Sequence, residues 1–301
     1  MNFGDEVPSD ADQPGAPTGE IGVFLHVATL GRYQEVADEV LLGVHKSGLF
    51  ERASFIEVSV VGEAPFVSPV IHDKVRIVRR SRDVTVFEHP TLDAIQAYSR
   101  AHPEAHVLYL NCLGGRHVGP HYEIRAQWRR LLQFMLVERY DHCVAALRTY
   151  DVCGVDWRRL PLPHMTSNNW WAKAGYLAGL CTPAECADRL ETVDLSAFGR
   201  QWSEPERKRR HSGEFWLGMN SEARGCSLFK LETAGFPPLQ YGSVPWWGMP
   251  GINWERAARR QFSSRRSPDL GLLSKILVYQ AKHRLRFLKP LMRPRAHGET
   301  I

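Results

Sequence analysis

The stretch Ile21-Gly22-Val23-Phe24-Leu25-His26-Val27 decides the fold class of this chain of 301 residues. It is an almost unbroken apolar run of strand length, which is typical of a strand buried on both faces in a parallel sheet. Apolar residues at helical spacing follow it and predict a helix that ends near Ser47-Gly48. The folded part of the chain therefore begins with a strand and then a helix.

The same alternation continues along the chain. Strand patterns occupy residues 55–61, 75–78 and 106–110, a helix is predicted from Thr91, and a long helix is predicted over about 121–150. This order predicts an α/β fold with a mostly parallel, Rossmann-like central sheet and helices on both faces. Ligands of such sheets bind beyond the carboxyl ends of the strands.

Composition and charge divide the chain into three expected parts. They are an acidic disordered tail over residues 1–19, a folded domain over 20–250 and a basic extension over 251–301 that contains an amphipathic helix at 270–288. The extension holds 12 Lys and Arg against 3 Asp and Glu, whereas the whole chain has a net charge of only +5. Two interpretations of this extension stay open: it rests on anionic lipid, or it packs on the body with its charges in solvent.

The chain opens without a secretory signal, and no apolar run approaches the ~20 residues that span a bilayer. We therefore expect a cytoplasmic protein, with peripheral contact at the inner face of the membrane as an extension of that expectation. Its six cysteines form no CxxC pair and are expected to stay reduced.

The run His164-Met165-Thr166-Ser167-Asn168-Asn169-Trp170-Trp171-Ala172-Lys173 combines small polar residues with two adjacent tryptophans. In a strand, neighbouring side chains point to opposite faces, so one indole is expected to line a surface or cleft. An aromatic wall beside hydroxyl and amide groups suits a sugar. The alternative is a buried aromatic corner, because Trp is highly buried on average.

Other candidate groups are less specific. Gly114-Gly115 follows a predicted strand and would let backbone approach a diphosphate, but it is equally a plain turn. Glu214 is a candidate general base among carboxylates that also include Asp151 and Asp156, or else a residue that favours a helix start. The histidines His117, His121 and His164 are a weak metal-ligand set, because Pro120 interrupts them. The chain has no GxGxxG, Walker, HExxH or GxSxG motif.

Taken in order, these segments resemble a group of bacterial and viral glycosyltransferase-like proteins with a GT-A, nucleotide-diphospho-sugar transferase type of fold. Members show a YLHTKG strand end, a Trp-Arg helix, an HFSGNFWWA signature and a later ExW. The counterparts here are Tyr109–Gly114, Trp128-Arg129, His164–Ala172 and Glu214–Trp216, and the preceding segment Phe87–Leu92 also matches. The resemblance covers residues 20 to 220.

The resemblance implies a glycosyltransferase that moves a sugar from a nucleotide-sugar donor to a hydroxyl of a cell-surface polysaccharide or glycolipid precursor. The expected catalytic residues are Glu214 and His164. The expected donor-binding residues are His26, Thr29, Asn111, Gly114, Gly115 and Arg116. The expected sugar- and acceptor-binding residues are Thr166, Ser167, Asn168, Trp170, Trp171 and Trp216.

The chain also departs from the pattern. Asn111 and Leu113 replace the His and Lys of the strand end, Ser167 replaces a Gly, and Asn169 replaces a Phe. The only Asp-x-Asp lies in the N-terminal tail, so no metal cofactor is expected. Any phosphate charge would then be met by the side chains of Arg116, Arg125 or Lys173.

Two alternatives belong to other functional classes. The first is a catalytically inactive protein that binds a saccharide or a protein partner on the same fold. The second is nucleic-acid binding through Arg259-Arg260 and Arg265-Arg266, which we disfavour because the charge lies in one tail without interleaved aromatic residues.

Overall fold

The computed structural model describes residues 19–159, 161–195, 205–229 and 254–261. The chain divides into two units, residues 1–229 and 230–301. The described part of the second unit is helix α9 (Trp254–Gln261). The expected N-terminal tail, the expected boundary at residue 250 and the amphipathic helix at 270–288 lie outside the described residues. Among the described helices, none combines the length and apolar character needed to cross a bilayer.

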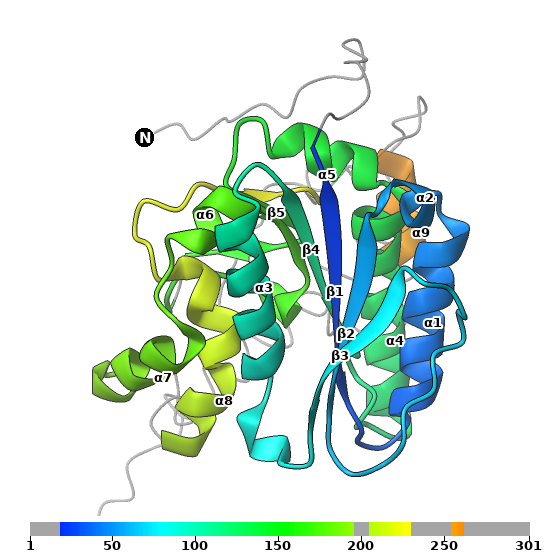
Figure 1. Ribbon diagram of the computed structural model, residues 1–301, viewed down its shortest axis with the longest axis horizontal. Coiled ribbons are helices and arrows are strands. Elements are labelled where there is room, and N and C mark those ends of the chain that lie inside the picture. The colour runs from blue at the N-terminus through cyan, green and yellow to red at the C-terminus, as the bar shows by residue number, and fades with distance from the viewer. Residues whose placement is uncertain (1–18, 160, 196–204, 230–253, 262–301) are drawn as a thin grey trace, which may run out of the picture. The chain divides into compact units, whose positions relative to one another are not determined.

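A seven-stranded sheet runs through the first unit in the order β3-β2-β1-β4-β8-β5-β9 (Figure 1). Its strands are β1 (Ile21–Ala28), β2 (Phe55–Val61), β3 (Val75–Ser81), β4 (His106–Asn111), β5 (Val152–Gly154), β8 (Trp170–Lys173) and β9 (Gly225–Ser227). Strand β8 runs antiparallel to β4 and β5, and all other pairs are parallel. A second, two-stranded sheet pairs β6 (Trp157–Arg158) with β7 (His164–Met165). The predicted α/β class and mostly parallel sheet are confirmed.

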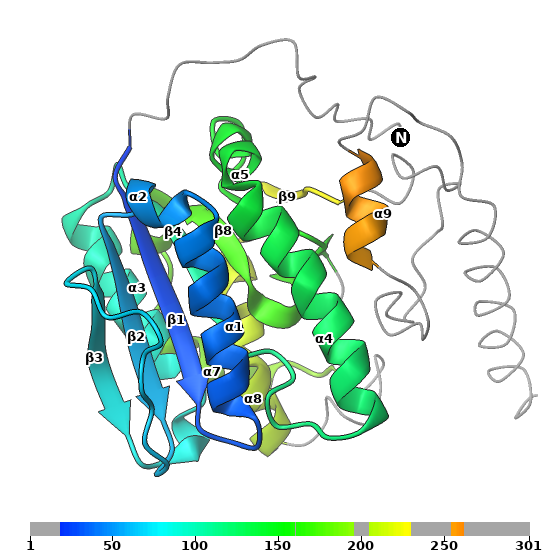
Figure 2. The ribbon, with the colours of Figure 1, turned by 90° about the vertical axis from the view of Figure 1, so that its right-hand side faces the viewer.

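Helices cover both faces of the large sheet (Figures 1 and 2). One face carries α1 (Tyr33–Lys46), α2 (Leu49–Arg52), α4 (Pro120–Gln133) and α5 (Tyr140–Ala146). The other face carries α3 (His89–Ala101), α6 (Ala174–Ala178), α7 (Pro183–Thr192) and α8 (Pro205–Phe215). Short 3-10 turns are η1 (Val84–Val86), η3 (Thr166–Asn168) and η6 (Trp216–Gly218).

The first strand lies in the interior of this sheet, as its sequence predicts. In β1, Ile21, Val23 and Leu25 are fully buried, and β2 and β4 pair with the strand on either side. The apolar run is needed because helices cover both faces of the sheet. The carboxyl ends of β1 and β4 therefore meet at one edge of the sheet.

Two predicted helices differ from the structure in their bounds. The long helix over 121–150 is divided, because a π-helical turn over Phe134–Glu138 separates α4 from α5. The Leu136 carbonyl in this turn accepts a hydrogen bond from the Trp171 indole at 2.8 Å. Helix α3 begins at His89, so Thr91 is not its cap. The Thr91 hydroxyl is buried and bonds to His26 Nδ1 at 2.9 Å.

Candidate functional site

The candidate site lies at the edge of the sheet where β1 and β4 end. Because β8 is antiparallel, its first residues lie at this same edge and pair with the end of β4. The Asn111 backbone N–H donates to Asn169 Oδ1 at 2.9 Å, and Asn169 Nδ2 donates to Asn111 Oδ1 at 3.2 Å. Two segments far apart in the sequence are thereby joined.

The loop between β7 and β8 has an unusual backbone. Ser167 and Asn168 have φ values of 70° and 49°, in the left-handed region that disfavours residues with a side chain. The Ser167 carbonyl accepts hydrogen bonds from the amides of Asn111 and Asn169, and Ser167 Oγ accepts one from the Trp128 indole. Backbone strain of this kind persists where the surrounding contacts over-determine it, and it gathers at functional sites.

Glu88 is the carboxylate at the centre of these contacts. It precedes α3, and its two carboxyl oxygens accept hydrogen bonds from Asn111 Nδ2, at 3.2 Å, and from Asn168 Nδ2. Burial, and next the negative charge of Glu214, raise its pKa to about 7, although the two amide hydrogen bonds act in the opposite direction. The Glu88 carboxyl therefore binds a proton at a higher pH than an ordinary glutamate does.

Glu214 lies near the end of α8 and has the opposite tendency. Burial acts to raise its pKa, but the hydrogen bond and charge of His211 and the charges of His164 and Arg210 outweigh it, so that its pKa is lowered. His211 Nδ1 lies 3.5 Å from Glu214 Oε1. Two neighbouring carboxyl groups whose pKa values are pushed apart are a recurring arrangement for acid and base roles.

Three arginines from separate elements lie on the Glu214 side of the site, where Arg125 and Arg210 interact with Glu214 and Arg116 lies near Arg210. Arg116 follows β4, Arg125 lies on α4 and Arg210 lies on α8. Burial, and after it the charge of Arg210, lower the pKa of Arg116. Burial also lowers the pKa of Arg125, and Arg116 adds to that effect while Glu214 opposes it. Arg116 therefore lies within electrostatic range of both Arg125 and Arg210, and such a group of cations suits an anionic ligand.

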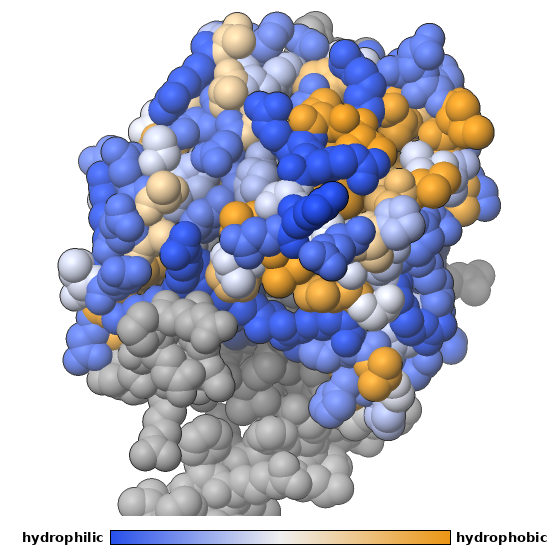
Figure 3. All heavy atoms as spheres, turned by 60° about the horizontal axis from the view of Figure 1, so that its bottom comes forward, coloured by the Kyte–Doolittle hydropathy of each residue, from blue (hydrophilic) through white to orange (hydrophobic). Residues whose placement is uncertain are grey.

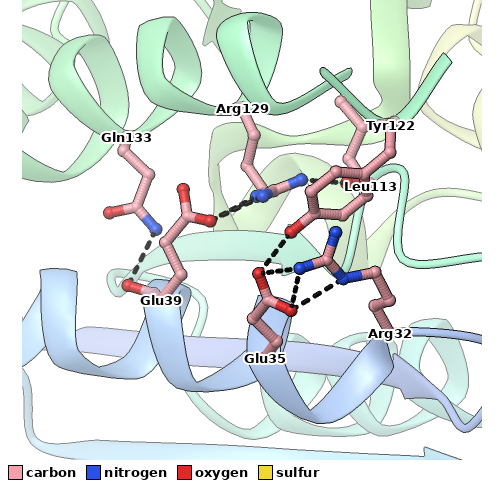
Figure 4. Close-up of polar contacts among 7 residues, drawn as sticks. All are labelled: Arg32, Glu35, Glu39, Leu113, Tyr122, Arg129 and Gln133. Carbon is pink, nitrogen blue, oxygen red and sulfur yellow. Dashed lines mark hydrogen bonds and ion pairs between the residues drawn. The ribbon is translucent and has the colours of Figure 1, made fainter. Parts of the chain in front are cut away.

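Helix α4 holds the glycine turn that carries Arg116, through the side chain of Arg129 (Figure 4). Arg129 is only 2% exposed, donates to the Leu113 carbonyl at 2.9 Å and pairs with Glu39 on α1 at 2.6 Å. Gly114 has φ 84°, and a Cβ at this position would lie 2.4 Å from the Cβ of Arg125. The glycine is therefore required for both its conformation and the close approach of α4.

A second polar cluster in Figure 4 holds the loop after β1 against α4. Glu35 accepts hydrogen bonds from Arg32 Nε at 2.7 Å and from the Tyr122 hydroxyl at 2.8 Å. The backbone N–H of Arg32 donates to the Gly115 carbonyl at 2.7 Å. The loops after β1 and β4 are therefore one connected surface.

The predicted aromatic wall is wrong. Trp170, Trp171 and Trp216 are all fully buried, and none lines a cleft. Adjacent side chains on β8 do point to opposite faces, but helices cover both faces, so each indole enters a core. Trp170 donates to Asn168 Oδ1 at 2.8 Å and packs against Tyr109, whereas Trp171 donates to the π-helical turn. Trp170 and Trp171 therefore hold the start of β8 and the turn before it in place, and they have no surface that a ligand could contact.

The structure also corrects the placement of two cationic or donor candidates. His26 is buried beneath α3, and burial lowers its pKa to about 4, so it is a neutral core residue. Lys173 lies at the far end of β8, where its Nζ is 3.6 Å from Asp151. There it lines a cavity of about 630 Å³ at the opposite, amino edge, together with Arg148 and Arg224.

The remaining predicted residues lie at or beside the site. Thr29 is buried, and its backbone N–H donates to the Val61 carbonyl. Thr166 is buried, and its hydroxyl donates to Asp156 at 2.9 Å. Nδ1 of His164 bonds to the Leu162 carbonyl at 2.7 Å, and the ring lies edge-on to Phe215. Burial lowers the pKa of His164.

Sequence reasoning missed two residues of the site, Glu88 and Arg210. Glu88 stands before a helix in the segment Phe87–Leu92, which the resemblance includes, but nothing local marks its carboxyl as buried. Arg210 stands in a run of basic residues that reads as a solvated helix face. Within the described residues, no three His, Cys, Asp or Glu side chains group in a way that could hold a metal ion.

Comparison with known proteins places the chain in a family without describing an activity. The family described as "Domain of unknown function (DUF8361)" matches residues 51–284, more than half of the chain. A comparison with curated proteins found no match.

Proposed function

We propose that this chain, which belongs to the DUF8361 family, transfers a sugar from a nucleoside-diphosphate donor to a hydroxyl group. One observation carries the proposal. A pair of carboxyl groups with divergent pKa values, Glu88 and Glu214, lies at the carboxyl edge of the sheet, where Arg125 and Arg210 interact with Glu214 and Arg116 lies near Arg210. Sugar transfer needs a base that accepts the proton of the acceptor hydroxyl and cations that stabilise the departing diphosphate.

The chemistry assigns a role to each group. The acceptor oxygen forms a bond to the anomeric carbon of the donor sugar, and the bond from that carbon to the diphosphate oxygen breaks. The electron pair leaves with the nucleoside diphosphate, whose charge Arg116, Arg125 and Arg210 stabilise. The hydroxyl proton passes to Glu214, which stays ionised near neutral pH and can therefore act as the base.

The polar loop supports the same assignment. Asn111 and Asn168 fix the Glu88 carboxyl, and a carboxyl with a pKa of about 7 can exchange a proton with ligands at neutral pH. The sheet order β3-β2-β1-β4 followed by an antiparallel β8 is compatible with the GT-A type of fold that the resemblance implies. The acceptor class, a polysaccharide or glycolipid precursor, rests on the resemblance alone.

Calorimetric titration of the full chain with uridine, guanosine and thymidine diphosphates tests the proposal. We expect one of them to bind and Arg116→Ala or Arg210→Ala to weaken it at least about tenfold, the size of one lost charged contact. The matched control is Arg148→Ala, an exposed arginine at the opposite edge of the sheet. If no diphosphate binds, or if the control weakens binding equally, the proposal fails.

A further inference from the structure

The loops that follow β1, β2, β3 and β4 expose aliphatic and basic side chains at the carboxyl edge of the sheet. Close to the carboxyl end of its strand, each presents an exposed aliphatic side chain, between 39% and 73% exposed, and several exposed arginines stand among them. We call this surface the carboxyl-edge rim. Its aliphatic members are Leu30 after β1, Val67 after β2, Val84 after β3 and Val118 after β4, and its basic members are Arg82, Arg116, Arg209 and Arg210.

Hydrogen bonds show that these loops are neighbours. The backbone of Thr29 bonds to Val61, that of Arg32 to Gly115, and that of Gly62 to Ser81, which joins all four strand ends. Gln34 Nε2 donates to the Val67 carbonyl at 2.7 Å. Figure 3 brings this edge forward and shows strongly hydrophilic residues gathered near its middle with hydrophobic residues beside them.

The charges of the rim extend the cations of the candidate site outward. Burial and then the charges of Arg116, Arg125 and others lower the pKa of His117, so cations crowd around this loop. Arg209 on α8 lies near Asp83, which is occupied by hydrogen bonds to Thr85. The same segments also carry the exposed acidic residues Glu63, Asp83 and Glu123, so the positive charge is concentrated at the arginines. Exposed aliphatic side chains among these arginines suit anionic lipid, because the aliphatic groups enter the interface while the cations meet headgroups.

We propose that the carboxyl-edge rim docks on an anionic lipid surface and so presents the site to an acceptor carried by a lipid. This inference rests on the proposed function and specifies its acceptor class. A soluble polyanion or a nucleic acid would use the arginines but would gain nothing from Leu30 and Val118, and single-stranded nucleic acid would call for exposed aromatic platforms. The exposed aliphatic members of the carboxyl-edge rim therefore favour a lipid surface over a soluble polyanion or a nucleic acid.

Cosedimentation of the full chain with vesicles tests the inference. We expect binding to phosphatidylcholine vesicles that contain phosphatidylglycerol, weaker binding to phosphatidylcholine alone, and loss of binding in the double variant Leu30→Asp/Val118→Asp. Arg82→Glu and Arg209→Glu should each weaken binding at least about fivefold, the effect of one basic residue near the membrane surface. The basic segment 251–301 is common to every variant.

The matched control is Ile71→Asp. Ile71 is 99% exposed, and it lies in the same loop as Val67 but near its other end, where the chain enters β3 at the opposite edge of the sheet. This variant should bind vesicles like the unaltered chain. Hydrogen exchange should also slow at residues 29–32 and 112–119 when vesicles are added.

Other outcomes overturn the inference. The first is equal vesicle binding by the rim variants and the control. The second is weaker vesicle binding by the arginine variants with no loss in the aliphatic variant, which would indicate a soluble polyanion or a nucleic acid as the ligand. Nucleoside-diphosphate binding is measured on the neutral variant Leu30→Ser/Val118→Ser, which adds no negative charge beside Arg116, and should be unchanged. A failure of vesicle binding therefore leaves the proposed function standing, whereas a failure of diphosphate binding by the unaltered chain contradicts the proposed function.

Discussion

The Trp128 indole donates its hydrogen bond to Ser167 Oγ, and so ties α4 to a loop residue whose backbone is left-handed. This contact and the backbone conformation make opposite demands on position 167. The hydroxyl is the acceptor for a buried N–H, whereas the φ of 70° favours glycine, the residue of the resembling signature.

Ser167→Ala should lower the free energy of unfolding by about 1–3 kcal/mol, because it leaves the buried Trp128 N–H without its acceptor. Ser167→Gly makes the same loss but relieves the left-handed strain, so it should be about 1 kcal/mol more stable than the alanine variant. Urea unfolding measures both. In a Trp128→Phe background the alanine substitution should lose most of its cost, and an unchanged cost there would show that the hydrogen bond is not the cause.

Gly114→Ala should both destabilise the protein and weaken diphosphate binding. The added Cβ would lie 2.4 Å from the Cβ of Arg125, so α4 or the turn must move. Gly119→Ala is the control, because Gly119 also has a positive φ, 59°, but has open space around it. We expect a loss of about 1 kcal/mol for the control and at least about 2 kcal/mol more for Gly114→Ala. Equal losses in urea unfolding would contradict the steric explanation.

Glu88 should make the protein less stable as the pH rises from about 4.5 to 7. Its pKa is raised to about 7 in the folded chain from an ordinary value of 4.5, so the folded state holds a proton that the unfolded state has lost. The free energy of unfolding therefore falls across this window, by up to about 3 kcal/mol. Below pH 4.5 the Glu88 carboxyl is protonated in both the folded and the unfolded chain, so it adds no further pH dependence. In Glu88→Gln the fall between pH 5 and pH 8, measured by urea unfolding, should shrink by that amount. An identical fall in the variant would remove Glu88 as its source.

Glu214→Gln should abolish sugar transfer while diphosphate binding persists. The amide cannot accept the acceptor proton, but it preserves the size of the side chain and its place on α8. A matched variant is Glu222→Gln, an exposed carboxyl at the opposite edge, which should transfer at the normal rate. Transfer is measured as release of nucleoside diphosphate in the presence of acceptor. Undiminished turnover by Glu214→Gln would exclude Glu214 as the base.

The parts of the fold that the sequence predicts are those with strong local signals. Unbroken apolar runs predict β1 and β4, and apolar residues at helical spacing predict α1, which ends at Lys46, next to the expected Ser47-Gly48. The π-helical turn carries no such signal. Its bounds depend on tertiary contacts such as the hydrogen bond from Trp171 to Leu136, and these are invisible in a helical pattern.

The site shows the same division. Residues that end predicted strands, such as Asn111, are brought together as expected, because strand direction fixes where they lie. The tryptophan pair was misread because alternation gives the face of each side chain but not what covers that face. Sequence reasoning missed Glu88 because its raised pKa results from burial and then from the charge of Glu214, and both depend on segments that are remote in sequence.

The reversed direction of β8 has an implication for how this site could diversify. At the carboxyl edge of the sheet, a parallel strand places the residues that follow it. The antiparallel strand β8 places there the residues that precede it. The turn at Thr166–Asn168 can therefore change its chemistry while the indoles just after it keep the strand anchored in two cores. The turn and the strand remain coupled through the hydrogen bond from the Trp170 indole to Asn168 Oδ1, so a change at position 168 alters both ligand contacts and anchorage.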